Sequence, residues 1–384
     1  MDLQELLRLV VEKKASDLFI TAGMPPSIKV NGKIRAVSQD PFSPEDAREM
    51  VYSAMTPTQR EAFDQTHECN FAISASGLGR FRVSAFYQRN HAGMVLRRIE
   101  TRIPTIESLH LPPIIKNLAM TKRGLVIFVG ATGTGKSTSL ASMIGYRNQN
   151  GEGHIVTLED PIEFIHQHGS CIITQREVGL DTESYEVGLK NTLRQAPDVI
   201  LIGEIRTRET MDYAIAFAET GHLCLSTLHA NNANQALDRI INFFPEDRRS
   251  QLLMDLSLNL KAIVAQQLIP TRDGRGRRAA VEVLINTPLA AEYIRNGEIH
   301  KLKDLMRRSN QQGMKTFDQA LYELYKAGEI SHEDALHHAD SPNEVRLMIK
   351  LDEEDPSQLA DAIEGLALQD PSDQYKVASR KAPK

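Results

Sequence analysis

The segment GATGTGKS at residues 130–137 has glycines, a lysine and a hydroxyl side chain at the spacing of a phosphate-binding loop. It matches G-x-x-x-x-G-K-[ST] and lies between the apolar run GLVIFV and a helical pattern. Glycines let backbone N–H groups close around phosphate oxygens, and the following helix presents its positive end to them. The segment therefore predicts a nucleotide site. A Gly-rich turn without a ligand is the alternative, and the strand-loop-helix context disfavours it.

The residue types in this loop indicate separate roles. Lys136 is expected to neutralise the β and γ phosphates, Ser137 to give its hydroxyl to magnesium, and Thr138 to help seat the α-phosphate. The chain lacks the guanine-reading motif N-K-x-D, so the predicted cofactors are ATP and Mg²⁺. The predicted nucleotide-binding residues are Gly130, Ala131, Thr132, Gly133, Thr134, Gly135, Lys136, Ser137 and Thr138.

Carboxylates follow two further strand candidates. DVILIGE delivers Glu204 to the carboxyl edge of a sheet, where its carboxylate can hold the magnesium through the water shell of the ion. TLEDPIEF places Glu159, Asp160 and Glu163 after another strand. One of these three carboxylates is expected to orient or deprotonate the attacking water. The alternatives are an exposed glutamate that only ends a strand and an acidic cluster that only caps a turn.

The segment TGHLCLSTLHANNA has a histidine at each end of an apolar strand, His222 and His229. A histidine beside a γ-phosphate can sense the state of the nucleotide by hydrogen bonding. Taken singly, each histidine is explained better by a structural role.

The elements that must position these residues form an α/β core. Four apolar runs, GLVIFVG, HIVTLED, DVILIGE and LCLSTL, alternate with helical segments, as expected of strands buried on both faces of a parallel sheet. Beyond Pro245 the pattern is mostly helical, with residues 246–268 interpreted as helix and RAAVEVLI as one strand. The last forty or so residues carry an acidic run and two prolines, which predicts a largely disordered tail with a short amphipathic helix at 358–368.

The first hundred residues are predicted to form a small mixed domain. Helical patterns at 3–13, 43–55 and 57–65 accompany strand candidates, and Asn31-Gly32 between two of these indicates a tight hairpin. RFRVSAFYQR alternates so that one face is buried and one is available. The predicted boundaries are 1–100 for this domain, 101–122 for a linker with a helix, 123–285 for the ATPase core, 286–340 for a helical region and 341–384 for the tail.

Composition excludes several classes of protein. With 41% hydrophobic and 25% charged residues, the chain of 384 residues is expected to be globular, with two cores. Three dispersed cysteines argue against a disulfide framework or a zinc site. The amino end lacks the charge pattern of a signal peptide, which predicts a cytoplasmic protein. A net charge of −5 gives no general attraction to nucleic acid, and no nucleic-acid partner is expected.

Four motifs in this order, GATGTGKST, TLEDPIE, DVILIGEIR and TGHLCLSTLH, resemble the Walker A, Asp box, Walker B and His box of the type II/type IV secretion ATPase superfamily. Within it the sequence is similar to the PilT/PilU family of pilus retraction ATPases. ASDLFITAGMPPSIKVNGKI and RFRVSAFYQR extend the likeness into the amino domain, so that it covers about nine tenths of the chain.

The resemblance implies a fold and a set of roles. The fold class is α/β, with a RecA-like P-loop core, a PAS-like α+β amino domain and a helical carboxyl region. It makes Glu163 the catalytic carboxylate, Glu204 the Walker B acid and His229 the γ-phosphate sensor. Arg82 and Arg97 are the best matches to the arginines that complete the site. It also implies a homo-hexamer, a PilT-type partner ATPase and an inner-membrane platform protein that keeps the motor at the membrane.

Two departures from the family pattern favour the accessory PilU type. The chain has GEIRTRET, with Thr207 where the family usually has an acid, so that any coupling through that carboxylate is in doubt. The AIRNLIRE sequence typical of PilT is replaced by LAAEYIRNGEI, and the tail extends beyond the usual PilT end.

Other functions remain as alternatives. An extension motor or secretion ATPase typically has a longer amino region and a four-cysteine zinc insert, which this sequence lacks. A RecA-like nucleic-acid motor would need a local basic channel. A nucleotide-binding subunit that modulates a PilT-type partner with little turnover of its own is the non-enzymatic alternative.

Overall fold

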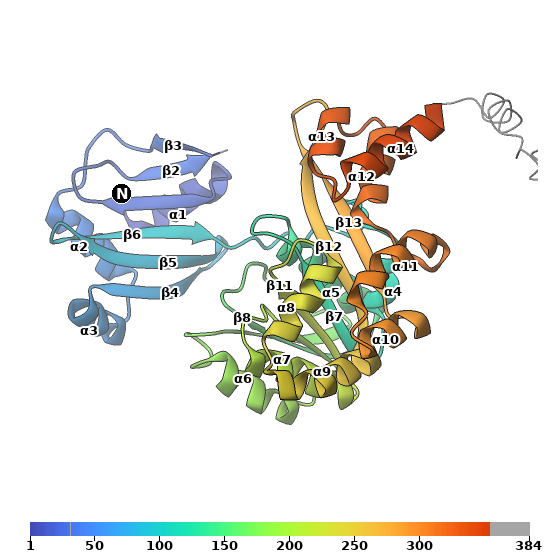
Figure 1. The fold of residues 1–384 in the computed structure, drawn as a ribbon. Helices are drawn as coiled ribbons and strands as arrows, with labels where there is room; N and C mark the ends of the chain where they lie inside the picture. Colours follow the sequence, from blue (N-terminus) through green and yellow to red (C-terminus); the bar gives the residue numbers. More distant parts are fainter. Residues whose placement is uncertain (31, 354–384) are drawn as a thin grey trace, which may run out of the picture.

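The computed structural model describes residues 1–30 and 32–353. These form an N-terminal α+β unit, an α/β core and a C-terminal group of helices (Figure 1). The predicted tail from residue 354 onward, including the helix proposed at 358–368, lies outside the described residues. No helix within the described ranges has both the length and the apolar composition that crossing a bilayer demands.

The N-terminal unit is one antiparallel sheet with helices packed against it. The strand order is β3-β2-β1-β6-β5-β4, and Phe63, Phe81 and Val83 are among the side chains fully buried in its core. Capping boxes at Asp2 and Ser43 fix the first turns of two of its helices. The elements are α1 Leu3–Glu12, β1 Asp17–Thr21, β2 Ser27–Val30, β3 Lys33–Ala36, α2 Pro44–Ser53, α3 Pro57–Thr66, β4 Glu68–Ala75, β5 Gly79–Gln88 and β6 His91–Arg98.

The predicted hairpin joins β2 to β3. Val30 pairs with Lys33, which leaves two residues for the turn. Gly32 has a φ of 78°, a left-handed conformation that glycine adopts without strain. Asn31, the other half of the predicted turn, lies outside the described residues.

The core is a seven-stranded sheet in the order β13-β12-β7-β11-β10-β8-β9. Neighbouring strands run parallel except for β12 and β13, which are antiparallel. Every residue of β7 and of β11 is buried, as the continuous apolar runs predicted. The strands are β7 Gly124–Val129, β8 Gly153–Glu159, β9 Cys171–Glu177, β10 Val199–Ile202, β11 Leu223–Leu228, β12 Leu260–Pro270 and β13 Arg277–Ile285.

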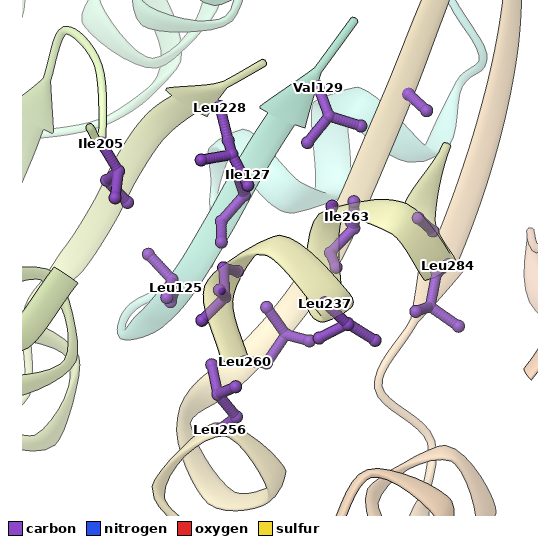
Figure 2. Packing of buried hydrophobic residues seen from close by; sticks show 14 of the residues in the cluster. Leu125, Ile127, Val129, Ile205, Leu228, Leu237, Leu256, Leu260, Ile263 and Leu284 are labelled. Carbon is purple, nitrogen blue, oxygen red and sulfur yellow. The ribbon is translucent and has the colours of Figure 1, made fainter. Parts of the chain in front are cut away.

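Helices cover both faces of this sheet. α4 (Ile114–Ala119) and α5 (Lys136–Asn150) pack on one face. α7 (Arg208–Glu219), α8 (Ala233–Asn242) and α9 (Glu246–Asn259) pack on the other, and α6 (Tyr185–Thr192) lies between β9 and β10 in the chain. Figure 2 shows Leu256 of α9 next to Leu260 of the sheet, in the cluster that also contains Leu237 of α8 and Ile127 and Ile263 of the sheet. Because helices cover both faces of the sheet, the polar residues that follow the strands lie at its carboxyl edge.

The helix predicted from residue 246 to residue 268 is wrong in its second half. α9 ends at Asn259, and the next eleven residues form β12, which pairs with β7 and β13. Val264 packs toward one helical layer and Ile263 toward the other. Periodicity alone does not distinguish a strand that is apolar on both faces from a buried helix, so only the pairing reveals the strand.

The C-terminal helices extend further than predicted. Residues 342–353, which the prediction assigned to the tail, form α14, whose Val345 and Ile349 are 0% and 6% exposed in the main core cluster. Asp352 of this helix pairs with Lys326 of α12. The folded region therefore continues at least to residue 353. The helices are α10 Pro288–Arg295, α11 Leu302–Arg308, α12 Phe317–Lys326, α13 His332–His337 and α14 Pro342–Glu353.

Candidate nucleotide site

The predicted phosphate-binding loop leaves the sheet at the carboxyl end of β7 and enters α5 at Lys136. Gly130, Gly133 and Gly135 have φ angles of 153°, 82° and 88°, in the region that favours glycine. The Thr134 hydroxyl donates to the Ala131 carbonyl at 2.9 Å and closes the loop on itself. Backbone N–H groups and the N-terminus of α5 thus meet at the edge of the sheet.

Lys136 lies within this loop with only 8% of its surface exposed. Its ammonium group donates to the carbonyl oxygens of Gly130 at 2.8 Å and Ala131 at 2.9 Å. Burial lowers the pKa of Lys136, and the nearby carboxylates of Glu204 and Glu163 oppose that effect. The ammonium group of Lys136 is therefore in a position to bind the phosphates of a nucleotide.

Glu204 and His229 lie side by side because β10 and β11 are adjacent parallel strands. The Nε2 atom of His229 is 3.2 Å from one carboxylate oxygen of Glu204, and the Nε atom of Arg206 donates to the other at 2.9 Å. The Glu204 side chain is 16% exposed. Hydrogen bonding to Glu204 raises the pKa of Arg206. The structure thus brings together two of the predicted residues and adds an arginine that the sequence reasoning did not select.

The three predicted carboxylates after β8 differ in environment. Glu159 is partly buried and accepts hydrogen bonds from the Thr157 hydroxyl at 2.7 Å and from the Gln175 amide at 3.2 Å. Burial raises the pKa of Glu159 to about 7, although these hydrogen bonds oppose the shift. Asp160 and Glu163 are exposed. Glu163 is therefore free to approach a ligand, whereas Glu159 is tied to its own sheet.

These groups surround one cavity of about 620 Å³. Six of the predicted loop residues line it: Thr132, Gly133, Gly135, Lys136, Ser137 and Thr138. Gly130, Ala131 and Thr134 are not part of the lining. Glu159, Asp160, Glu163, Glu204 and His229 also line it. The cavity therefore combines a cation, a hydroxyl and carboxylates, which are groups that phosphoryl transfer uses, with an imidazole beside them.

The two predicted arginines lie elsewhere in this chain. Arg82 of β5 donates to the Ile162 carbonyl at 3.0 Å and so reaches the loop that carries Glu163. Burial lowers the pKa of Arg82, and the charges of Glu177 and Glu163 oppose that shift. Arg97 pairs with Asp17 at 2.8 Å within the N-terminal sheet. Neither arginine is part of the cavity lining.

The first histidine of the fourth motif, His222, makes structural contacts. His222 precedes β11 and therefore lies at the edge of the sheet opposite to the cavity. Its Nδ1 atom is 3.0 Å from the Thr220 hydroxyl and 3.2 Å from the Phe217 carbonyl oxygen. His222 therefore fits the structural alternative, whereas His229 lines the cavity.

Several further cavity residues were missed from the sequence, among them Tyr185, Leu268 and Arg277. Tyr185 begins α6, Leu268 lies in β12 and Arg277 begins β13. Burial, with a contribution from Asp160, raises the pKa of Tyr185, so its phenol stays neutral. Leu268 lay in the segment interpreted as helix, and no motif marked the other two.

Thr207 has a clear local role where the family usually has an acid. Its hydroxyl accepts from the Thr210 backbone N–H and caps the first turn of α7. Threonine and aspartate are both favoured caps at such a position. The substitution therefore preserves the helix start while it removes a negative charge near Arg206.

The comparisons with known proteins decide the family. The family described as "Type II/IV secretion system protein" matches residues 1–336. The chain belongs to this family. The type IV pilus ATPase PilU of Pseudomonas aeruginosa is 71% identical to this chain over 370 residues, which cover 96% of this chain and 97% of PilU.

Two further comparisons extend to PilT. The type IV pilus retraction ATPase PilT of Pseudomonas aeruginosa is 39% identical over 342 residues, covering 89% of this chain and 99% of PilT. A crystal structure of the pilus retraction motor PilT with bound ADP has a TM-score of 0.84 at 39% identity and covers 90% of this chain and 99% of that one. The predicted PilT/PilU resemblance, the α/β fold and the class of enzyme, an ATPase of the type II/IV secretion family, are confirmed.

Proposed function

We propose that this chain hydrolyses ATP in the cavity at the carboxyl edge of its core sheet and thereby powers type IV pilus retraction as an accessory motor of the PilU type. The observation that carries the proposal is the convergence of Lys136, Glu163, Glu204 and His229 on that one cavity. The 71% identity to PilU over nearly the whole length of both chains supports the accessory role.

The residues present fit a magnesium ion bound together with ATP. The Ser137 hydroxyl and the Glu204 carboxylate both line the cavity beside Lys136. Oxygen ligands suit Mg²⁺, which usually keeps several waters and binds substrate phosphates rather than a cage of side chains. Accordingly, no group of three or more histidine, cysteine or acidic residues among the described residues could hold a metal alone. Bound there, the ion would neutralise charge on the phosphates.

The chain's own residues divide the remaining work. Lys136 exchanges its carbonyl partners for phosphate oxygens, and Thr138 seats the α-phosphate. Glu163 orients the attacking water and accepts its proton, because its carboxylate is exposed and does not take part in the hydrogen bonds that hold Glu159. His229 contacts the γ-phosphate and reports its presence to Glu204 through their 3.2 Å contact.

We place the two N-terminal arginines at the site of a neighbouring subunit in a homo-hexameric ring. Neither Arg82 nor Arg97 lines the cavity of its own chain, and Arg97 is largely exposed in its pair with Asp17. The Nε atom of Arg82 has no hydrogen-bond partner in the described part of the chain. A guanidinium supplied across an interface stabilises the transferring phosphoryl group.

Mixing two inactive variants tests this arrangement. Arg82→Ala/Arg97→Ala chains and Lys136→Ala chains should each be inactive, whereas mixed rings should regain part of the turnover. The gain arises where an intact P-loop meets intact arginines from its neighbour. Phosphate release is measured at several mixing ratios, with each variant mixed with itself as the control. If mixed rings of confirmed size stay as inactive as their parents, the assignment across subunits is wrong.

The partners follow from the same proposal. The ring acts beside a PilT-type ATPase on an inner-membrane platform protein, so it lies in the cytoplasm and is held peripherally at the membrane through the pilus machine. Nucleic acid is not a partner, because the chain has a net charge of −5 and its site is lined by carboxylates.

Retraction measured in cells tests the accessory role. Cells that carry both this protein and a PilT-type motor should retract pili against a higher load than cells with the PilT-type motor alone. Cells that carry only this protein should retract little. Stall force is measured by tethering pili to beads, with expression matched between strains. Equal stall forces with and without this protein would contradict the proposal.

A further inference from the structure

Gln266 is a buried polar residue outside the four motifs. It lies in β12, is 3% exposed, and directly follows Ala265, which pairs with the last residue of β7, Val129. Gln266 is therefore next to Gly130, at the point where the phosphate-binding loop leaves the sheet. Because side chains alternate along a strand, Gln266 faces the same layer as Ala262 and Val264, which is the layer of α5.

Both ends of the Gln266 amide are used. Its NH₂ group donates to the Thr134 carbonyl at 2.8 Å, and its oxygen accepts from the Ser139 hydroxyl at 2.8 Å. Thr134 belongs to the loop, and Ser139 to the first turn of α5. One side chain from a distant part of the sequence thus holds the loop and the helix together.

The loop glycines make room for this residue. A Cβ atom at Gly130 would lie 2.6 Å from the Gln266 carbonyl oxygen, and one at Gly135 would lie 2.8 Å from its amide nitrogen. These are closer than a Cβ normally approaches other atoms. Gly130 and Gly135 therefore serve two purposes. They let the loop close around phosphate, and they let β12 lie close to the loop.

We propose that Gln266 is a positioning residue that sets the shape of the phosphate-binding loop from the neighbouring strand β12. By holding the Thr134 carbonyl against β12, it turns the peptide groups of the loop so that their N–H groups face the cavity. Ser139 shares the same amide, so the start of α5 is fixed to the same point. The inference rests on the proposed ATP site in this loop and adds a determinant of its affinity.

The expected effect is on binding more than on chemistry. Gln266→Met keeps the length of the side chain and removes both hydrogen bonds. We expect the Kd for ADP and the KM for ATP to rise about 5- to 20-fold, as the loss of one or two buried hydrogen bonds predicts. The kcat at saturating ATP should change by less than about 3-fold, because Gln266 touches none of the groups that act on the attacking water.

The experiment uses the full chain and three comparisons. Gln267→Met is the matched control, because Gln267 is the next residue of β12 and points to the other face of the sheet. Ser139→Ala removes one of the two hydrogen bonds of the Gln266 amide. Its combination with Gln266→Met tests whether the two residues act as one unit. Lys136→Ala reports on the ATP site itself. ADP binding by calorimetry, steady-state kinetics and thermal midpoints are measured for each variant.

The predicted result is a KM effect for Gln266→Met, a smaller one for Ser139→Ala, little further loss in the double variant, and wild-type values for Gln267→Met. ADP affinity equal to that of Gln267→Met would overturn the inference. So would a loss explained fully by a reduced fraction of folded protein. If Lys136→Ala binds and turns over ATP normally, the proposed site itself fails, and this outcome differs from a failure at Gln266 alone.

Discussion

Lys136→Ala is expected to abolish productive ATP binding and to reduce magnesium-dependent turnover at least about 100-fold. The Lys136 ammonium is the one side-chain cation inside the loop, where it donates to the carbonyl oxygens of Gly130 and Ala131. A methyl group cannot replace a charge-assisted hydrogen bond to phosphate. ATP affinity by calorimetry and phosphate release by a coupled assay measure the two effects.

The matched control for this change is Lys190→Ala. Lys190 is an exposed lysine of α6, so its loss removes the same charge away from the loop and should leave both quantities unchanged. Thermal midpoints of both variants show whether the fold survives. Near-normal turnover in a folded Lys136→Ala protein would remove the loop from the mechanism.

Glu163→Gln is expected to keep ATP affinity within about 3-fold of the wild type and to lose about 100- to 10,000-fold in hydrolysis, the range of general base catalysis. The amide has nearly the same shape but cannot accept the proton of the attacking water. Because Glu163 is exposed at the cavity, the change should not disturb packing. Equilibrium ATP binding and single-turnover hydrolysis separate the two effects.

Two comparisons sharpen this prediction. Glu204→Gln should weaken magnesium-dependent nucleotide binding, because it disturbs the contacts with Arg206 and His229. Glu186→Gln, at an exposed site on α6, should behave as the wild type. An equal loss of affinity and hydrolysis in Glu163→Gln would assign Glu163 to metal binding or to structure. Undiminished hydrolysis would move the base to Asp160 or Glu159.

The sequence predicted the phosphate-binding loop and five further polar residues of the cavity, because these residues follow the ends of buried strands. Lys136, Glu163, Glu204 and His229 each come shortly after an apolar run, and parallel strands place such residues at one edge. Four apolar runs, now β7, β8, β10 and β11, and the later strand β13 were predicted in their order along the chain, whereas β9 and β12 were not predicted as strands. The lateral order of the strands, β7 between β12 and β11, was not predicted either, because it depends on long-range pairing.

The residues that escaped prediction come from segments whose neighbours are remote in sequence. Gln266 is one of two adjacent glutamines in an otherwise mostly apolar segment, and only the pairing of β12 with β7 places it beside the loop. Tyr185 and Arg277 reach the cavity from α6 and β13 without any motif. Likewise, composition placed α14 in the tail, whereas Val345 and Ile349 bury against helices that precede them in the chain.

A crystal structure of the protein with Mg²⁺ and a non-hydrolysable ATP analogue tests the central claim most directly. We predict the nucleotide in the cavity at the carboxyl edge of the sheet, with Lys136 moved from the Gly130 and Ala131 carbonyls onto the β and γ phosphates. The metal should lie between the Ser137 hydroxyl and the Glu204 carboxylate, and His229 should contact the γ-phosphate. A nucleotide bound elsewhere, with Lys136 still on its two carbonyls, would contradict the account.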